Sequence, residues 1–387
     1  MKLGSELAAL TAGIDQLFRS ARRGSGFLDD EGLIPVAVAA VAPQPLSDYA
    51  EATAALEALR ARLPQEAESA LRRAYLDEMI DSLLALVATF QEPGLPFAER
   101  VRRQIRVDTQ MVDDTVLEGY RTLIRDRLND LGYGGGDIAA DVRRWEADNR
   151  VPPDSLLGVL RAFLVEGRSR TAALFGGLEQ EWLEPVEMRD VPFSAYCDYP
   201  GRTLMLNLDS PYTTYALKHL AVHEAFPGHL VHLHRREALV AAGAMALDGA
   251  QVVTSSASSA LFEGIADNGL YFLDWVESPA DELAIALRRL RGALRCNAAW
   301  LLHAEQRPAD EVAEKIAEAG FEEQERAVAR LAFIRHGLRA PFVYAYWCGD
   351  MAVNEVWQKV SPVRRPEFWA YLYNNMHTPT TLRTFWA

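Results

Sequence analysis

Residues 218–234 read KHLAVHEAFPGHLVHLH, and this stretch carries the strongest functional signal in the sequence. It holds five of the protein's 8 histidines: His219, His223, His229, His232 and His234. Histidine clusters are seldom needed for packing, whereas imidazole nitrogens are good ligands for transition metals. A carboxylate directly after a ligand histidine, as in His223-Glu224, can take a proton from water at such a metal. The stretch therefore predicts a zinc site.

The spacing of the two central histidines departs from the usual zinc-binding helix, in which the ligands are four residues apart. Four residues after His223 stands Pro227, and the next histidine, His229, is six residues on. On an unbroken helix His229 would lie roughly 120° around from His223. Pro227 cannot donate an amide hydrogen bond and crowds the carbonyl of His223, while Gly228 tolerates unusual torsions. We therefore expect a distorted or interrupted helix that returns His229 to the metal.

A third ligand is expected from a later helix. Glu263 and Asp267 are four residues apart there, so both side chains share one face. We assign Glu263 to the metal. Asp267 is expected to accept the ring N–H of a ligand histidine, a bond that orients the ring and raises its basicity. Gly264, beside Glu263, would let another helix approach closely.

Other histidines of the stretch leave alternatives open. His219 lies four residues before His223, so these two form a rival ligand pair, although that pair leaves Glu224 poorly explained. His232 could likewise replace one proposed ligand. Otherwise His232 and His234 are expected to face the substrate, to support a ligand or to lie on the surface.

Two motifs together resemble a known family. Residues 223–229 (HEAFPGH) and 262–264 (FEG) are similar to a large bacterial family of uncharacterised proteins with a His-Glu-x-x-Pro-Gly-His helix and a later Glu-Gly motif. That family looks related to the gluzincin zinc metallopeptidases. The resemblance covers roughly residues 196–360. It implies a gluzincin-like helical fold with zinc held by His223, His229 and Glu263, and with Glu224 as general base.

The chain departs from the family pattern at two places. After the Glu-Gly motif the family has an aromatic and an aliphatic residue, where this chain has Ile265 and Asp267. A later Gln-Ala-x-x-Tyr-x-x-Gly pattern keeps Tyr346 and Gly349 but has Phe342 in place of glutamine. Phe342 cannot perform any substrate-binding role of that glutamine. Tyr346 is a candidate catalytic residue, because its hydroxyl can donate to a developing oxyanion.

Composition bounds the function class. The chain has 387 residues and a formal net charge of -14, which argues against a nucleic acid or an anionic membrane as partner. The N-terminus lacks the apolar core of a signal peptide, and no apolar run reaches the ~20 residues that span a bilayer. Cys197, Cys296 and Cys348 are too few and too far apart for a disulfide framework. We expect a soluble cytoplasmic protein.

Helical periodicity dominates the chain, for example over residues 46–90, 112–131, 156–174 and 281–305. Strand signals are confined to residues 193–197 and 202–208, on either side of a Pro-Gly turn. The second strand could accept an extended peptide along its edge or be a plain wall strand. Asp209-Ser210-Pro211 is expected to start the helix that carries the histidines.

These patterns predict a mainly α fold with a small β-sheet or hairpin next to the metal-binding helix. We expect an N-terminal helical part over residues 1–190 and a metal-binding catalytic part over residues 191–387, packed together as one two-lobed unit. The predicted function is zinc-dependent hydrolysis of peptide or related amide bonds. The alternatives are a non-catalytic, metal-stabilised helical binding protein and a hydrolase of non-peptide amides or esters.

Overall fold

The computed structural model describes residues 2–21, 30–91, 94–107, 111–178, 180–191 and 193–386. Most of these residues are helical and short strands form two small sheets, which confirms the mainly α class. The chain divides into two compact units, a first of residues 1–109, 232–265 and 344–387, and a second of residues 110–231 and 266–343. Both units draw residues from either side of residue 190. The division passes through helices α10 (His229–Ala241) and α11 (Ser259–Asp267).

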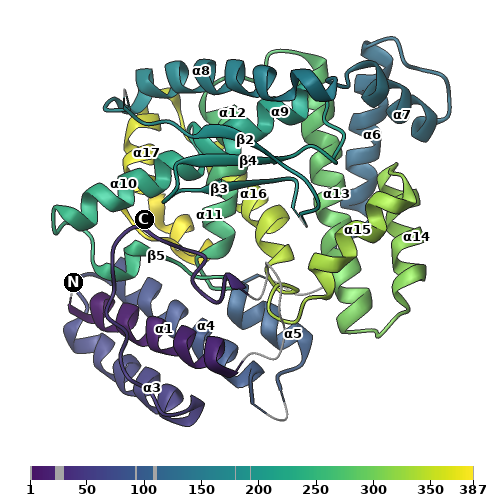
Figure 1. The fold of residues 1–387 in the computed structure, drawn as a ribbon. Coiled ribbons are helices and arrows are strands. Elements are labelled where there is room, and N and C mark those ends of the chain that lie inside the picture. The colour runs from purple at the N-terminus through teal and green to yellow at the C-terminus, as the bar shows by residue number, and fades with distance from the viewer. Residues whose placement is uncertain are drawn as a thin grey trace. The chain divides into compact units, whose positions relative to one another are not determined.

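The first unit is built from helices and one short sheet (Figure 1). Besides most of α10 and α11, its helices are α1 (Lys2–Ala21), α3 (Tyr49–Glu66), α4 (Ala70–Thr89), α5 (Phe97–Arg100), α16 (Val343–Trp357), α17 (Arg365–Asn374) and α18 (Pro379–Leu382). Shorter turns are the π-helical η1 (Val101–Ile105) and the 3₁₀ turns η4 (Leu247–Ala250), η5 (Pro362–Arg364) and η6 (Arg383–Trp386). Strands β1 (Val36–Ala37) and β5 (Gln251–Val252) pair antiparallel.

Local capping explains where the N-terminal helices of this unit begin. The carboxylate of Asp48 accepts the backbone N–H of Glu51 (2.8 Å) at the start of α3. Ser69 caps α4 in the same way, so the periodic region 46–90 forms two helices and not one. α1, α3 and α4 pack against one another (Figure 1) and bury leucines such as Leu56.

The second unit contains the larger sheet and the remaining helices. The helices are α6 (Asp114–Asp130), α7 (Ile138–Asp148), α8 (Leu156–Phe175), α9 (Thr214–Leu220), α12 (Gly269–Phe272), α13 (Pro279–His303), α14 (Ala309–Gly320) and α15 (Gln324–Arg335). The turns are the 3₁₀ η2 (Pro153–Ser155) and the π-helical η3 (Ala221–Ala225). The strands are β2 (Glu184–Met188), β3 (Ala195–Asp198) and β4 (Thr203–Asn207).

The sheet of the second unit has the strand order β2–β4–β3. β3 and β4 pair antiparallel, which confirms the strand pair expected around the Pro-Gly turn. β2 pairs parallel with β4 and was not expected, because its sequence, EPVEM, carries a proline and two glutamates, which are uncommon in strands. α8 packs against β2, α9 and η3 and so covers the sheet (Figure 1).

This order decides between the two alternatives for the second predicted strand. The strand at residues 202–208 is a wall strand and cannot accept a peptide along its edge, because β4 is the central strand and both its edges are already paired. β3 is the edge strand: within the part of the chain that the structure describes, no strand pairs with its outer side.

The helix that carries the histidines also begins later than expected. Its cap is Thr213, whose hydroxyl accepts a backbone N–H three residues on (3.1 Å). The Asp209 carboxylate instead accepts hydrogen bonds from the backbone N–H of Asp190 (2.7 Å) and from the Arg189 guanidinium (3.0 Å). The prediction of a helix start at residues 209–211 is therefore wrong by a few residues.

An apolar cluster fixes the histidine segment in the second unit. Val222 packs with Leu270, Leu273, Trp275 and Ile285, all of them buried. This cluster joins η3 to α12 and α13, so the segment has a rigid support behind it.

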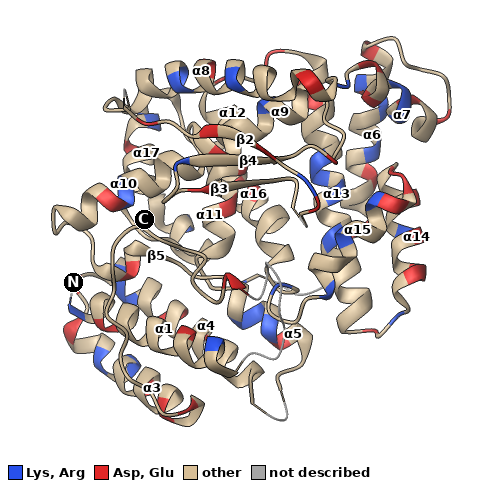
Figure 2. Cartoon of the chain, in the orientation of Figure 1, with Lys and Arg blue, Asp and Glu red and all other residues tan. Residues whose placement is uncertain are grey.

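Charged residues of both signs are interspersed along the helices (Figure 2). No helix among the described residues is long and apolar enough to cross a membrane.

Candidate metal centre

The helix through the histidine stretch is interrupted where Pro227 and Gly228 stand. α9 passes into the π-helical turn η3, which ends at Ala225, and Phe226 is extended (φ -122°, ψ 103°). A new helix, α10, begins at His229. The interruption predicted from the Pro-Gly pair is therefore confirmed.

Gly228 is required by a close backbone approach. Its N–H donates to the carbonyl of Val222 (3.0 Å), and an added Cβ would lie 1.8 Å from the carbonyl oxygen of His223. No side chain fits in that space. Gly228 thus lets the chain fold back over the turn that carries His223.

The interruption brings two imidazoles together. The ring centroids of His223 and His229 are 4.6 Å apart and the rings meet edge to face. Both side chains are buried. On an unbroken helix, residues six positions apart would point in different directions. Here the interruption lets the rings of His223 and His229 meet.

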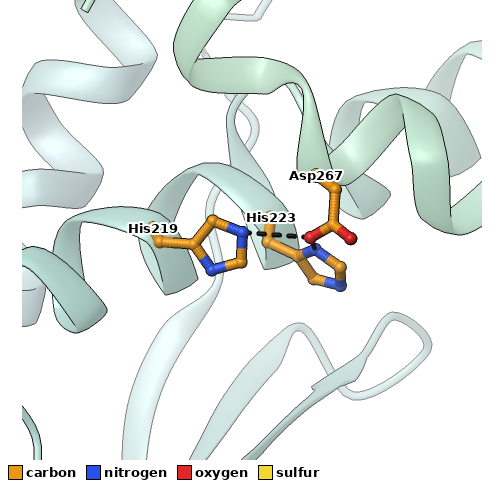
Figure 3. A group of neighbouring side chains, drawn as sticks. All are labelled: His219, His223 and Asp267. Atoms are coloured by element: carbon orange, nitrogen blue, oxygen red, sulfur yellow. Dashed lines mark hydrogen bonds and ion pairs between the residues drawn. The ribbon is translucent and has the colours of Figure 1, made fainter. Parts of the chain in front are cut away.

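Asp267 fixes the ring of His223 (Figure 3). Its Oδ1 lies 2.9 Å from Nδ1 of His223 and 3.0 Å from Nε2 of His219. The bond to His223 confirms the partner expected for Asp267. Because Asp267 engages Nδ1, the nitrogen of His223 that can bind a metal is Nε2.

Arg288 of α13 also reaches Asp267, with Nη1 2.9 Å from the same Oδ1. Burial alone would raise the pKa of the Asp267 carboxyl, but the positive charge of Arg288 and the bonds from the two histidines hold that pKa well below its usual value. Asp267 is therefore ionised. Burial, with the charge of Arg288, lowers the pKa of His219 to about 4, so His219 is neutral at pH 7.

These contacts bear on the rival ligand pair of His219 and His223. Ligand atoms of His219, His223 and Asp267 lie within 4.8 Å of one another, close enough to surround a cation. The single Asp267 oxygen, however, already meets two imidazoles and the Arg288 guanidinium. A cation at that point would stand beside a guanidinium, so we assign this group to orienting His223 and not to binding metal.

Glu263 precedes Asp267 by one turn of α11, and the two buried side chains share one face of that helix. Gly264 lies against the carbonyl of Gly349 in α16, where an added Cβ would be 2.2 Å from the oxygen. The close helix approach expected at Gly264 is confirmed. Tyr346 lies on α16 one turn before Gly349 and is half-buried.

Glu224 lies in η3 beside β3. Burial raises the pKa of the Cys197 thiol in β3 well above its ordinary value, and the negative charge of Glu224 adds to that rise. Glu224 is itself buried. The carboxylate is therefore held next to the edge strand of the sheet.

Two further histidines belong to packed surroundings. His232 of α10 lies between the rings of Phe262 (5.6 Å between centroids) and Tyr373 (5.5 Å). His377 is buried, and its Nε2 lies 2.8 Å from the carbonyl oxygen of Tyr371. Among the residues that the structure describes, neither histidine belongs to a group of side chains close enough to hold a metal ion together.

Arg288 was not among the residues expected at the site. It lies half-buried on α13, whose sequence carries no metal motif. No local pattern could have paired it with Asp267.

Comparison with known proteins gives the class of fold and no activity. No protein-family model matches this sequence, and no curated protein is similar to it. Two solved structures are similar in fold, each of a protein provisionally named a lipoprotein. The one from Colwellia psychrerythraea has a TM-score of 0.57 at 13% identity, over 87% of this chain and 66% of that one. The other, of unknown function, is from Shewanella oneidensis (TM-score 0.54, 13% identity, 89% and 74% covered).

At this identity the likeness concerns the fold alone. The chain spans just under two thirds of the length of the Colwellia protein. The resemblance of residues 223–229 and 262–264 to gluzincin-like metallopeptidases stays a prediction.

For a site that binds zinc as the sequence predicts, replacing Asp267 by asparagine should weaken zinc binding about 10–100-fold, the usual cost of losing a partner that orients a ligand histidine. The amide keeps the shape of the side chain but lacks the charge that Arg288 and the His223 ring require. Competition against a chelating dye measures the affinity.

His219→Gln is the control, since His219 contacts Asp267 without being assigned to the metal. It should bind zinc within a few-fold of the unmodified protein. A loss as large as that of a ligand variant would favour the rival pair of His219 and His223.

Proposed function

We propose that this protein is a zinc-dependent hydrolase of peptide or related amide bonds, with a gluzincin-like fold. The observation that carries the proposal is the interrupted helix, which sets the rings of His223 and His229 against each other while Asp267 holds Nδ1 of His223. A histidine fixed in this way is typical of metal ligands.

The donor set proposed for zinc is His223, His229 and Glu263. Two imidazoles and one carboxylate, with a fourth position for water, match catalytic zinc sites. Glu263 is supported by the register of α11, because it stands one turn before the Asp267 that contacts His223. When bound, zinc supplies Lewis acidity, which acidifies water at the site and polarises a carbonyl.

The chain's own residues would supply the proton transfers. Glu224 directly follows a proposed ligand and is buried, so its carboxylate is proposed to take the proton of the attacking water and pass it to the leaving amine. Tyr346, half-buried on α16, is proposed to donate its hydroxyl to the developing oxyanion. A buried base beside zinc has no purpose at a purely structural site, which normally fills all four positions with protein ligands.

The edge strand suggests how a peptide would lie. β3 is the edge strand and packs against the η3 turn that carries Glu224, so an extended substrate is proposed to add to the sheet there. The expected cytoplasmic location and the absence of nucleic-acid and membrane partners stay predictions.

One experiment tests the proposal. The purified protein is analysed for metals and then incubated with a peptide library whose products are read by mass spectrometry. We expect about one zinc per chain and cleavage that a chelator abolishes and added zinc restores. If the protein contains zinc but cleaves no peptide or amide, the hydrolase is refuted and the alternative of a non-catalytic, metal-stabilised binding protein is favoured. No metal at all would refute the proposal.

A further inference from the structure

A cluster in the second unit carries more positive than negative charge. Arg291 of α13 is bonded to Glu146 (2.7 Å) and to Glu322 (2.9 Å), and Arg330 of α15 is also bonded to Glu322. Basic residues of α13 and α15 come together where these two helices meet (Figure 2). Both carboxylates of the cluster are thus taken by Arg291 and Arg330.

Arg326, one turn before Arg330 on α15, is the third arginine. Its guanidinium makes no hydrogen bond or ion pair with any residue that the structure describes. It is half-buried, and burial together with the charges of Arg330 and Arg291 lowers its pKa, while the carboxylates of Glu146 and Glu322 attract it. A half-buried guanidinium that makes no hydrogen bond to these carboxylates is poorly satisfied, and an incoming anion would supply the charged hydrogen bonds that it lacks.

The cluster lies at the start of the helix that leads to the histidines. Trp145, next to Glu146, stacks on Tyr215 in the first turn of α9 (5.5 Å between centroids). The N–H of Val151 donates to the carbonyl of Tyr212 (2.9 Å), just before that helix. Burial raises the pKa of the Tyr212 hydroxyl, and the opposite charges of Arg326 and Glu224 both act on it.

β3 connects this place with the proposed base. The Tyr212 hydroxyl donates to the carbonyl of Ser194 (2.6 Å), the residue before β3, while Cys197 lies further along this strand, which packs against the η3 turn that carries Glu224. Three residues of strand span about 10 Å. An extended peptide beside β3 therefore covers the path from Glu224 to Tyr212 with about three residues.

We propose that Arg326 binds a carboxylate of the substrate, about three residues from the bond that is cleaved. This inference rests on the proposed peptide hydrolysis. The carboxylate belongs either to the C-terminus of a short peptide or to an acidic side chain at that position. Both present the same two oxygens to a guanidinium, which pairs with them through two N–H groups.

Peptide binding to the Glu224→Gln variant tests the inference without turnover. Calorimetry compares one hexapeptide as free acid, as C-terminal amide, and as an amide that ends in glutamate. The free acid should bind about 10-fold or more tightly than the plain amide, as expected for a charged hydrogen bond. Arg326→Met added to Glu224→Gln should remove that difference, and Arg326→Lys should restore part of it.

Arg125→Met is the matched control, because Arg125 is exposed on α6 of the same unit. It should keep the preference for the acid. If the glutamate amide binds like the free acid, the site takes any carboxylate; if it binds like the plain amide, the site takes only the C-terminus. Equal binding of acid and amide, or a preference that survives Arg326→Met, would overturn the inference.

Turnover by the unmodified protein separates this inference from the proposed function. If no peptide is cleaved but the acid preference depends on Arg326, the hydrolase is refuted and the carboxylate site stands. If acid and amide are cleaved with the same kcat/KM and bound equally, the hydrolase stands and the carboxylate site is refuted.

Discussion

Zinc is expected to be lost from the purified protein when His223 is replaced by alanine or Glu263 by glutamine. Each change removes one of three proposed protein ligands, so the loss of affinity should exceed the ~10–100-fold expected when only a ligand's partner is removed. Glu263→Gln keeps the size of a buried side chain, which limits damage to α11. Metal analysis after dialysis, with circular dichroism to confirm folding, measures the outcome.

His234→Ala is the control for this pair, because it removes a histidine of the same stretch that is not assigned to the metal. It should keep about one zinc per chain. Unchanged zinc in folded His223→Ala and Glu263→Gln would refute the ligand assignment. Loss in His223→Ala alone would show that the third ligand is a residue other than Glu263.

The helix break could be predicted because its cause is local. Proline cannot continue the hydrogen bonding of a helix, and glycine alone fits where the backbone folds back on itself. Both residues stand next to each other between His223 and His229, and the structure ends one helix and begins another there. The pairing of Asp267 with a histidine was equally accessible, because Glu263 and Asp267 are one helical turn apart.

The order of the strands in the sheet, unlike the helix break, could not be predicted from the local sequence. The sequence near the Pro-Gly turn indicates that β3 and β4 pair, but it does not say which of them has a second neighbour. β2, which precedes the pair along the chain, adds to β4 and so leaves β3 as the edge. The strand proposed to receive a peptide is consequently β3, which packs against the η3 turn that carries Glu224.

Long-range charge pairing was also hidden from the sequence. Arg288 and Arg326 stand on helices whose sequences contain several arginines, and nothing local distinguishes the one that meets Asp267 or the one that makes no ion pair with a described residue. Their roles depend on how α13 and α15 pack. Helical periodicity could indicate which faces are buried, but not which charged residue meets which.

Glu224→Gln is expected to lower kcat about 10²–10⁴-fold, the usual contribution of a general base, while the zinc content stays unchanged. Glutamine keeps the shape of the buried side chain beside β3 but cannot accept the proton of the attacking water. Steady-state rates on a peptide found in the library digest, with metal analysis of the same sample, measure both quantities.

Cys197→Ala is the control. It changes the strand beside the base without removing a carboxylate, so it should retain zinc and most of the rate. Retained hydrolysis in Glu224→Gln would refute the assignment of the base and leave the ligands standing. Zinc lost together with the rate would mean that Glu224 itself contributes to holding the metal.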